Sequence, residues 1–150
     1  MDEPEAGRAI APNRAARRDT QGFRPSCDPV FHYLMEQALA GKLAVHRAVV
    51  PLRLIYPYDA SYHPQDLPIG RLVIGLVIRE WERGASPVVR VYPDKDRFVL
   101  SDDYVYFEAA LKAKRPDLHC LVLGEADHPG VREIEGPLPR GELKRALEWI

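Results

Sequence analysis

Two adjacent carboxylates, Asp102 and Asp103, are the residues of this chain whose types and spacing could most directly do chemistry. With a third acid, Glu108 or Asp96, they could hold a divalent cation through carboxylate oxygens, as a metal-assisted nuclease requires. Adjacent acids at a helix start more often act as caps, because their oxygens accept hydrogen bonds from the first free amides. Capping is therefore the favoured interpretation, and a metal site is the alternative.

The elements that would position these acids are a hairpin and a helix. The β-branched run 87–92 predicts one strand, residues 93–96 have the composition of a turn, and residues 97–100 predict a second strand. The sequence Ser101-Asp102-Asp103 would then open an amphipathic helix. The acids are thus expected at a helix N-terminus that directly follows a strand.

The rest of the chain predicts further short elements around this unit. Helices are expected from Pro29 to a stop at Gly41, from Ile69 to a stop at Gly84, and over about 139–149; strands are expected over 43–50 and 118–123. Asp28 would cap the first helix. This order predicts an α/β (α+β) fold with a small mixed sheet flanked by helices, in a single domain over 27–150 that follows a flexible arm, 1–26.

Composition limits the classes of function. The 150 residues suit one core, and 21 Lys plus Arg against 22 Asp plus Glu leave a net charge of −1, so bulk charge attracts neither nucleic acid nor an anionic membrane. The sequence has no apolar run of about 18 residues and its start does not resemble a secretory signal, so a cytoplasmic protein is expected. Cys27 and Cys120 lack metal-ligand spacing and are expected to be free thiols.

Basic residues provide a weak case for nucleic-acid binding. The predicted arm contains Arg14, Arg17 and Arg18, which could neutralise phosphates, but acids in the same segment nearly cancel their charge. A second basic cluster, Lys112, Lys114 and Arg115, ends the predicted helix after Asp103. A DNA-binding accessory protein therefore stays open as an alternative.

Aromatic residues provide the case for a protein partner. The segment 56–68 is rich in tyrosine and proline, and its Tyr58, Tyr62 and His63 could form a contact surface with Tyr104 and Tyr106 of the following helix. Packing of the loop onto the core is the alternative for these residues. The other histidines, His32 and His46, have no second ligand at a suitable spacing and are not expected to bind metal.

Residues 46–124 resemble the N-terminal domain of the ParB/sulfiredoxin superfamily. The resemblance rests on four stretches. Val50-Pro51-Leu52-Arg53-Leu54-Ile55-Tyr56-Pro57 looks like the family's opening Ile-Pro-Leu-x-x-Ile-x-Pro, and residues 84–91 look like its Gly-x-x-x-Pro-Ile-x-Val region, one residue shorter. Residues 98–111 look like the strand and helix around its nucleotide motif, and residues 118–123 fit the strand that comes next. It implies a ParB/sulfiredoxin-like fold.

The chain departs from the family at the residues that carry its chemistry. Where many partition proteins of the family have Gly-Glu-Arg-Arg, this chain has Asp103-Tyr104-Val105-Tyr106, which replaces phosphate-binding groups with a carboxylate. The reactive cysteine of the sulfiredoxins and the paired histidines of the serine kinases have no counterpart here. We therefore expect no catalytic residues and no cofactor.

These features predict a non-catalytic ParB-like binding or regulatory protein. The expected partner is a protein of plasmid, phage or chromosome-related machinery, as the resemblance implies. The alternatives are a divergent metal-dependent nuclease or nucleotide hydrolase of the same fold, and the DNA-binding accessory protein named above.

Overall fold

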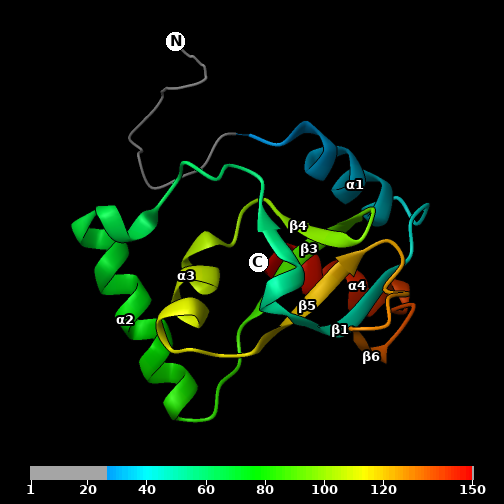
Figure 1. Ribbon diagram of the computed structural model, residues 1–150. Coiled ribbons are helices and arrows are strands. Elements are labelled where there is room, and N and C mark those ends of the chain that lie inside the picture. Colours follow the sequence, from blue (N-terminus) through cyan, green and yellow to red (C-terminus); the bar gives the residue numbers. More distant parts are fainter. Residues whose placement is uncertain (1–26, 150) are drawn as a thin grey trace.

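The computed structural model describes residues 27–149, which form one mixed sheet with helices on both faces (Figure 1). The expected arm, 1–26, lies outside the described residues. The strands are ordered β2-β4-β3-β5-β1-β6. Their bounds are β1 Val45–Pro51, β2 Ile55–Pro57, β3 Val88–Asp94, β4 Arg97–Leu100, β5 Asp117–Leu123 and β6 Arg132–Glu135.

The sheet combines parallel and antiparallel neighbours. β3 pairs antiparallel with β4 and parallel with β5, β2 pairs parallel with β4, and β1 pairs antiparallel with both β5 and β6. Because β2 and β4 run in the same direction, their carboxyl ends meet at one edge, where Pro57 lies opposite Leu100. The predicted mixed α/β fold is confirmed, and this edge carries the acids that the sequence singled out.

Four helices cover the two faces of the sheet, and α3 lies between α2 and the strands (Figure 1). One face is packed by α1, Pro29–Leu39, and α4, Arg140–Trp149, and the other by α3, Tyr104–Lys112, whose far side is covered by α2, Pro68–Glu82. Two 3-10 turns, Leu52–Leu54 and Pro64–Asp66, complete the described part. None of the helices between residues 27 and 149 is long and apolar enough to cross a bilayer.

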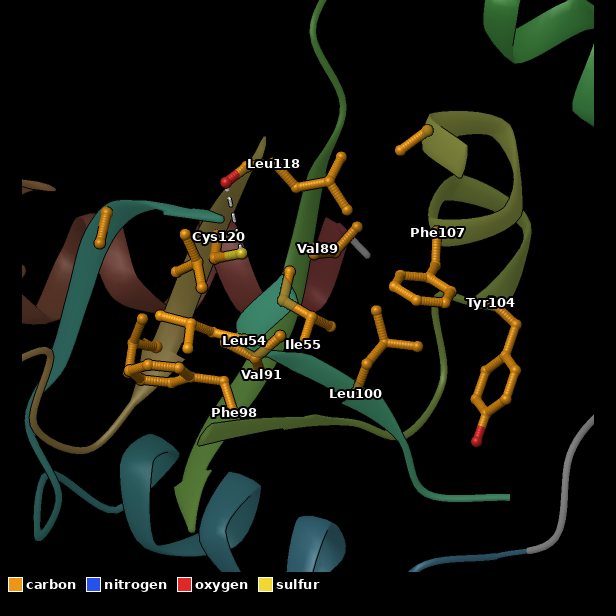
Figure 2. Close-up of a cluster of buried hydrophobic side chains, with 14 of the residues drawn as sticks. Leu54, Ile55, Val89, Val91, Phe98, Leu100, Tyr104, Phe107, Leu118 and Cys120 are labelled. Atoms are coloured by element: carbon orange, nitrogen blue, oxygen red, sulfur yellow. Dashed lines mark hydrogen bonds between the residues drawn. The ribbon is translucent and has the colours of Figure 1, made fainter. Parts of the chain in front are cut away.

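The central strand β5 shows why both faces need helices. Its alternate side chains belong to different cores: Leu118, Cys120 and Val122 join the cluster under α3 (Figure 2), whereas Leu121 and Leu123 join the cluster under α1 and α4. From Cys120 to Leu123 the strand is buried on both faces and therefore carries an unbroken run of apolar residues, without alternation between apolar and polar.

The helix boundaries follow the signals expected from the sequence. Asp28 Oδ1 accepts hydrogen bonds from the amides of Val30 and Phe31, at 3.0 and 3.4 Å, so its predicted role as the α1 cap is confirmed. Gly41 and Gly84 adopt φ values of +79° and +98° just after α1 and α2. Both therefore act as the left-handed stops that were predicted.

Two strands were not expected from the sequence. β2 consists of three residues, two of them inside the segment expected to be a loop, and it forms hydrogen bonds with β4, which is distant in sequence but adjacent in space. β6 has the sequence Arg-Glu-Ile-Glu, which is largely exposed at the sheet edge and carries no buried-strand pattern. The hairpin turn is also tighter than expected: Pro93 and Asp94 pair with β4, and Lys95 takes a φ of +60°.

Candidate functional site

Asp102 and Asp103 both contact Arg90, a buried arginine of β3, at the start of α3. Arg90 Nη2 lies 3.1 Å from Asp102 Oδ2 and 3.3 Å from Asp103 Oδ1, and the Arg90 amide donates a 2.9 Å hydrogen bond to Asp103 Oδ2. Asp103 is buried, whereas the Asp102 side chain is 41% exposed. Arg90 is therefore bound by two carboxylates, one inside the protein and one at its surface.

The expectation that these acids cap α3 is wrong. Asp103 occupies the cap position, but its side chain makes no hydrogen bond to the helix amides. Its oxygens are engaged by Arg90, because an arginine buried without a carboxylate partner would be far more costly than an open helix end. Arg90 was a visible signal for this pairing, since it interrupts an otherwise apolar strand.

Burial dominates the electrostatics of this cluster. Desolvation raises the pKa of Asp103 above its ordinary value, and the nearby positive charge of Arg90 opposes part of that rise. The guanidinium also lies 5.3 Å from the centre of the Phe31 ring in α1, a cation–π distance. Arg90 is thus enclosed by charge on one side and by an aromatic ring on another, with little surface left for a ligand.

Asp28 forms a second buried polar node beside this cluster. In addition to capping α1, its Oδ2 accepts hydrogen bonds from Tyr92 Oη at 2.7 Å and from Ser101 Oγ at 2.5 Å. Burial and the bond to Asp28 raise the pKa of Tyr92. Sequence reasoning identified Asp28 as a cap but not as the link between α1, β3 and the end of β4, because its partners are 64 and 73 residues away.

The structure does not bring the proposed metal ligands together. Glu108 lies near His63, Gln65 and Asp66, and burial raises its pKa. Asp96 lies in the β3–β4 turn, at the opposite end of the hairpin from Ser101. Within 27–149, no group of three or more His, Cys, Asp or Glu side chains is arranged to hold a metal ion.

The expected tyrosine surface divides into buried and exposed residues. Tyr104 is only 2% exposed; its hydroxyl accepts a hydrogen bond from the Asp59 amide at 2.5 Å, and its ring lies 5.2 Å from that of Tyr62, edge to face. The expectation that Tyr104 contributes contact area is therefore wrong, because it shares the buried face of α3 with Phe107. Tyr58, by contrast, is 43% exposed.

The other members of that surface lie at intermediate positions. Tyr62 and Tyr106 are half-buried and pack against the core under α3, and His63 is exposed. Tyr56, the third tyrosine of the 56–68 segment, is also exposed in β2, with the Arg97 guanidinium stacked 4.6 Å from its ring centre. The exposed aromatic surface is therefore centred on Tyr56 and Tyr58.

The basic residues are dispersed. Arg14, Arg17 and Arg18 lie outside the described residues. Arg115 stacks over the buried Trp81 at 4.7 Å, Lys112 lines a cavity of about 340 Å³ beside Glu108, and Lys114 takes a φ of +57° at the end of α3. All three residues of the second basic cluster are exposed, and Arg115 also packs on an aromatic ring.

The two cysteines have different environments. Cys120 is buried in β5, and burial raises the pKa of its thiol. Cys27 is exposed, and its pKa is raised by partial burial and by the charges of Asp28 and Asp102. Among residues 27–149, no cation lowers the pKa of either thiol, as activation of a cysteine nucleophile would require.

Comparisons with protein-family models, with curated proteins and with solved structures find no match for this chain.

Proposed function

We propose that this chain is a non-catalytic binding protein of ParB/sulfiredoxin-like fold that acts through contacts with a protein partner. The observation that carries the proposal is the mutual pairing of the polar groups at the start of α3. Arg90 is bound by Asp102 and Asp103, and Asp28 is bound by Tyr92, Ser101 and two α1 amides.

Pairing of this kind opposes catalysis. A general acid or base must reach the substrate, and a phosphate or metal site needs a charged side chain that is free to pair with the ligand. Here a triphosphate would compete with two carboxylates for Arg90, and a cation would compete with Arg90 for both carboxylates. Either exchange would expose buried charge that is now compensated.

The partner surface is formed by Tyr58 together with Tyr56, His63 and the half-buried Tyr62 and Tyr106. Exposed tyrosines give large contact area with few rotatable bonds, which makes them favourable contact residues. Tyr58 follows β2 directly, and its amide donates a 2.8 Å hydrogen bond to Leu100 O, so its backbone is fixed to the sheet edge. A backbone held in this way has less conformational entropy to lose on binding.

Affinity capture with immobilised chain tests this proposal. We expect a specific partner band with the wild-type chain and its loss with Tyr58→Ala, a change that leaves the core intact because the residue is exposed. Tyr33→Ala is the matched control, since Tyr33 is an exposed tyrosine of α1. Capture that Tyr58→Ala leaves unchanged would remove the proposed surface.

The enzymatic alternative predicts a different result. A metal-dependent nuclease would nick plasmid DNA in the presence of magnesium and would lose that activity when both Asp102→Asn and Asp103→Asn are introduced. A nicking activity with this dependence would replace the binding proposal.

A further inference from the structure

The cavity beside Glu108 lies where α2, α3 and the 3-10 turn Pro64–Asp66 meet, and it has a volume of about 340 Å³. α2 and α3 lie side by side here (Figure 1). The cavity is lined by two aliphatic and four polar side chains: Ile74, Leu111, Gln65, Arg71, Glu108 and Lys112. Sites for small molecules typically combine an apolar lining with a few polar groups that converge on the ligand.

The side-chain amide of Gln65 is satisfied at only one of its ends. Its N–H group donates a hydrogen bond to the Glu108 carboxylate. Its Oε1 is buried and has no hydrogen-bond partner among residues 27–149. A buried acceptor without a donor is rare in folded proteins and costs free energy. A ligand that carries an N–H group would supply the missing donor.

Glu108 is a partly buried carboxylate without an ion-pair partner. Burial raises its pKa, and the charges of His63 and Asp66 act on it in opposite directions. Although Lys112 follows it by about one helical turn, Glu108 forms no ion pair within the part of the chain that the structure describes. An ammonium group bound here would compensate the carboxylate and also donate to Gln65 Oε1.

Arg71 and Lys112 present the opposite requirement. Arg71 Nη1 donates a 2.9 Å hydrogen bond to the backbone oxygen of Gln65, which holds the guanidinium beside the cavity. Neither Arg71 nor Lys112 pairs with a carboxylate of residues 27–149. Two unpaired cations that line one cavity favour a ligand with a carboxylate, for which the arginine fork provides matched donors.

We propose that this cavity binds a free α-amino acid with an apolar side chain. The ammonium group is bound by Glu108 and Gln65 Oε1, and the carboxylate is bound by Arg71 and Lys112. The side chain of the ligand packs on the aliphatic part of the lining. The volume lies at the small end of the range for ligand sites, roughly 300–1,000 Å³, which suits a molecule of this size.

The site is separate from the proposed partner surface. None of the residues that line the cavity belongs to the set Tyr56, Tyr58, Tyr62, His63 and Tyr106. Amino-acid binding and partner capture therefore succeed or fail independently of each other.

Titration of the full 17.0 kDa chain with each of the apolar L-amino acids tests the site, with binding followed by calorimetry and by NMR. We expect saturable binding of at least one of them, with shifts of the signals from the residues that line the cavity. Two analogues of the bound amino acid then separate its charges. The N-acetyl derivative lacks the ammonium group and the carboxamide lacks the carboxylate, so each should bind about tenfold or more weakly.

Substitutions assign the two charges of the ligand to residues. Arg71→Gln should weaken binding of the amino acid by about tenfold or more, and should not weaken binding of the carboxamide further. Glu108→Gln should have the same effect on the amino acid, and should not weaken binding of the N-acetyl derivative further. Arg79→Gln is the matched control, because Arg79 is an exposed arginine of α2 that does not line the cavity, and it should leave every affinity unchanged.

Three results would overturn the amino-acid site. One is the absence of saturable binding for every apolar amino acid, so that water alone fills the cavity. Another is equal binding of the N-acetyl derivative, which would mean that a carboxylate alone is recognised, as at the C-terminus of a peptide. The third is binding that Arg71→Gln and Glu108→Gln both leave unchanged.

Discussion

Arg90 and Asp103 contact each other through both backbone and side chain: the Arg90 amide and Nε lie 2.9 and 3.4 Å from the same Asp103 oxygen, Oδ2. The contact ties the start of α3 to β3, which lies between β4 and β5 in the sheet. The carboxylate that would repel an incoming phosphate therefore also holds the helix in place.

Loss of the buried carboxylate should destabilise the fold. Asp103→Asn leaves the Arg90 charge buried with one carboxylate in place of two, so the free energy of unfolding should fall by about 3 kcal/mol. Urea denaturation measures this change. Asp102→Asn is the control: its side chain is partly exposed, and the loss should be below about 1 kcal/mol. Equal losses in the two variants would contradict the assignment of Asp103 as the inner partner.

The Asp28 node should be equally important. Asp28→Ala removes the α1 cap and leaves the Tyr92 and Ser101 hydroxyls without their acceptor, so we expect a loss of about 3 kcal/mol in urea. Tyr92→Phe removes one of these bonds and should cost about 2 kcal/mol. For comparison, Asp94→Ala breaks only an exposed pair with Arg97 and should cost less than about 1 kcal/mol.

The two glycines of α2 should respond in opposite ways to alanine. Gly70→Ala forces a methyl group into the Pro64 carbonyl and should destabilise the chain by about 2 kcal/mol. Gly75→Ala meets open space and should stabilise the chain by up to about 1 kcal/mol through helix propensity. Thermal unfolding separates these signs, and a loss of stability at position 75 would contradict the open space.

The two thiols should react at different rates. A thiol-specific reagent should label Cys27 in the folded chain and Cys120 only after unfolding, because Cys120 is buried in β5. The raised pKa of Cys27 means that less thiolate is present at a given pH than for a free cysteine, so its labelling should be slower near neutrality and should accelerate as pH rises. Cys27→Ser should abolish the native reaction, and rapid labelling of Cys120 in the native chain would contradict its burial.

Local signals predicted the elements better than their contacts. The cap at Asp28, the stop at Gly84 and the strand ending at Leu123 depend on neighbours in sequence, so they were predictable. β2 and β6 were missed because one is three residues long and the other is largely exposed, and both exist through pairing with distant strands.

The candidate site was only partly predictable for a similar reason. The importance of Asp102 and Asp103 could be inferred from their position at a helix start, but their partner, Arg90, is on another strand. Tyr104 was expected at a partner surface, although its spacing of three residues from Phe107 places both on one face of the helix. The sequence pattern identified Asp102 and Asp103 as important. Their role as partners of Arg90 depends on the pairing of β3 with β4.

Calorimetric titration of the chain with ATP and magnesium tests most directly the claim that the start of α3 is a closed structural node. We predict no saturable heat, because Arg90 is already bound by Asp102 and Asp103. Saturable, magnesium-dependent binding that Asp102→Asn abolishes would contradict it.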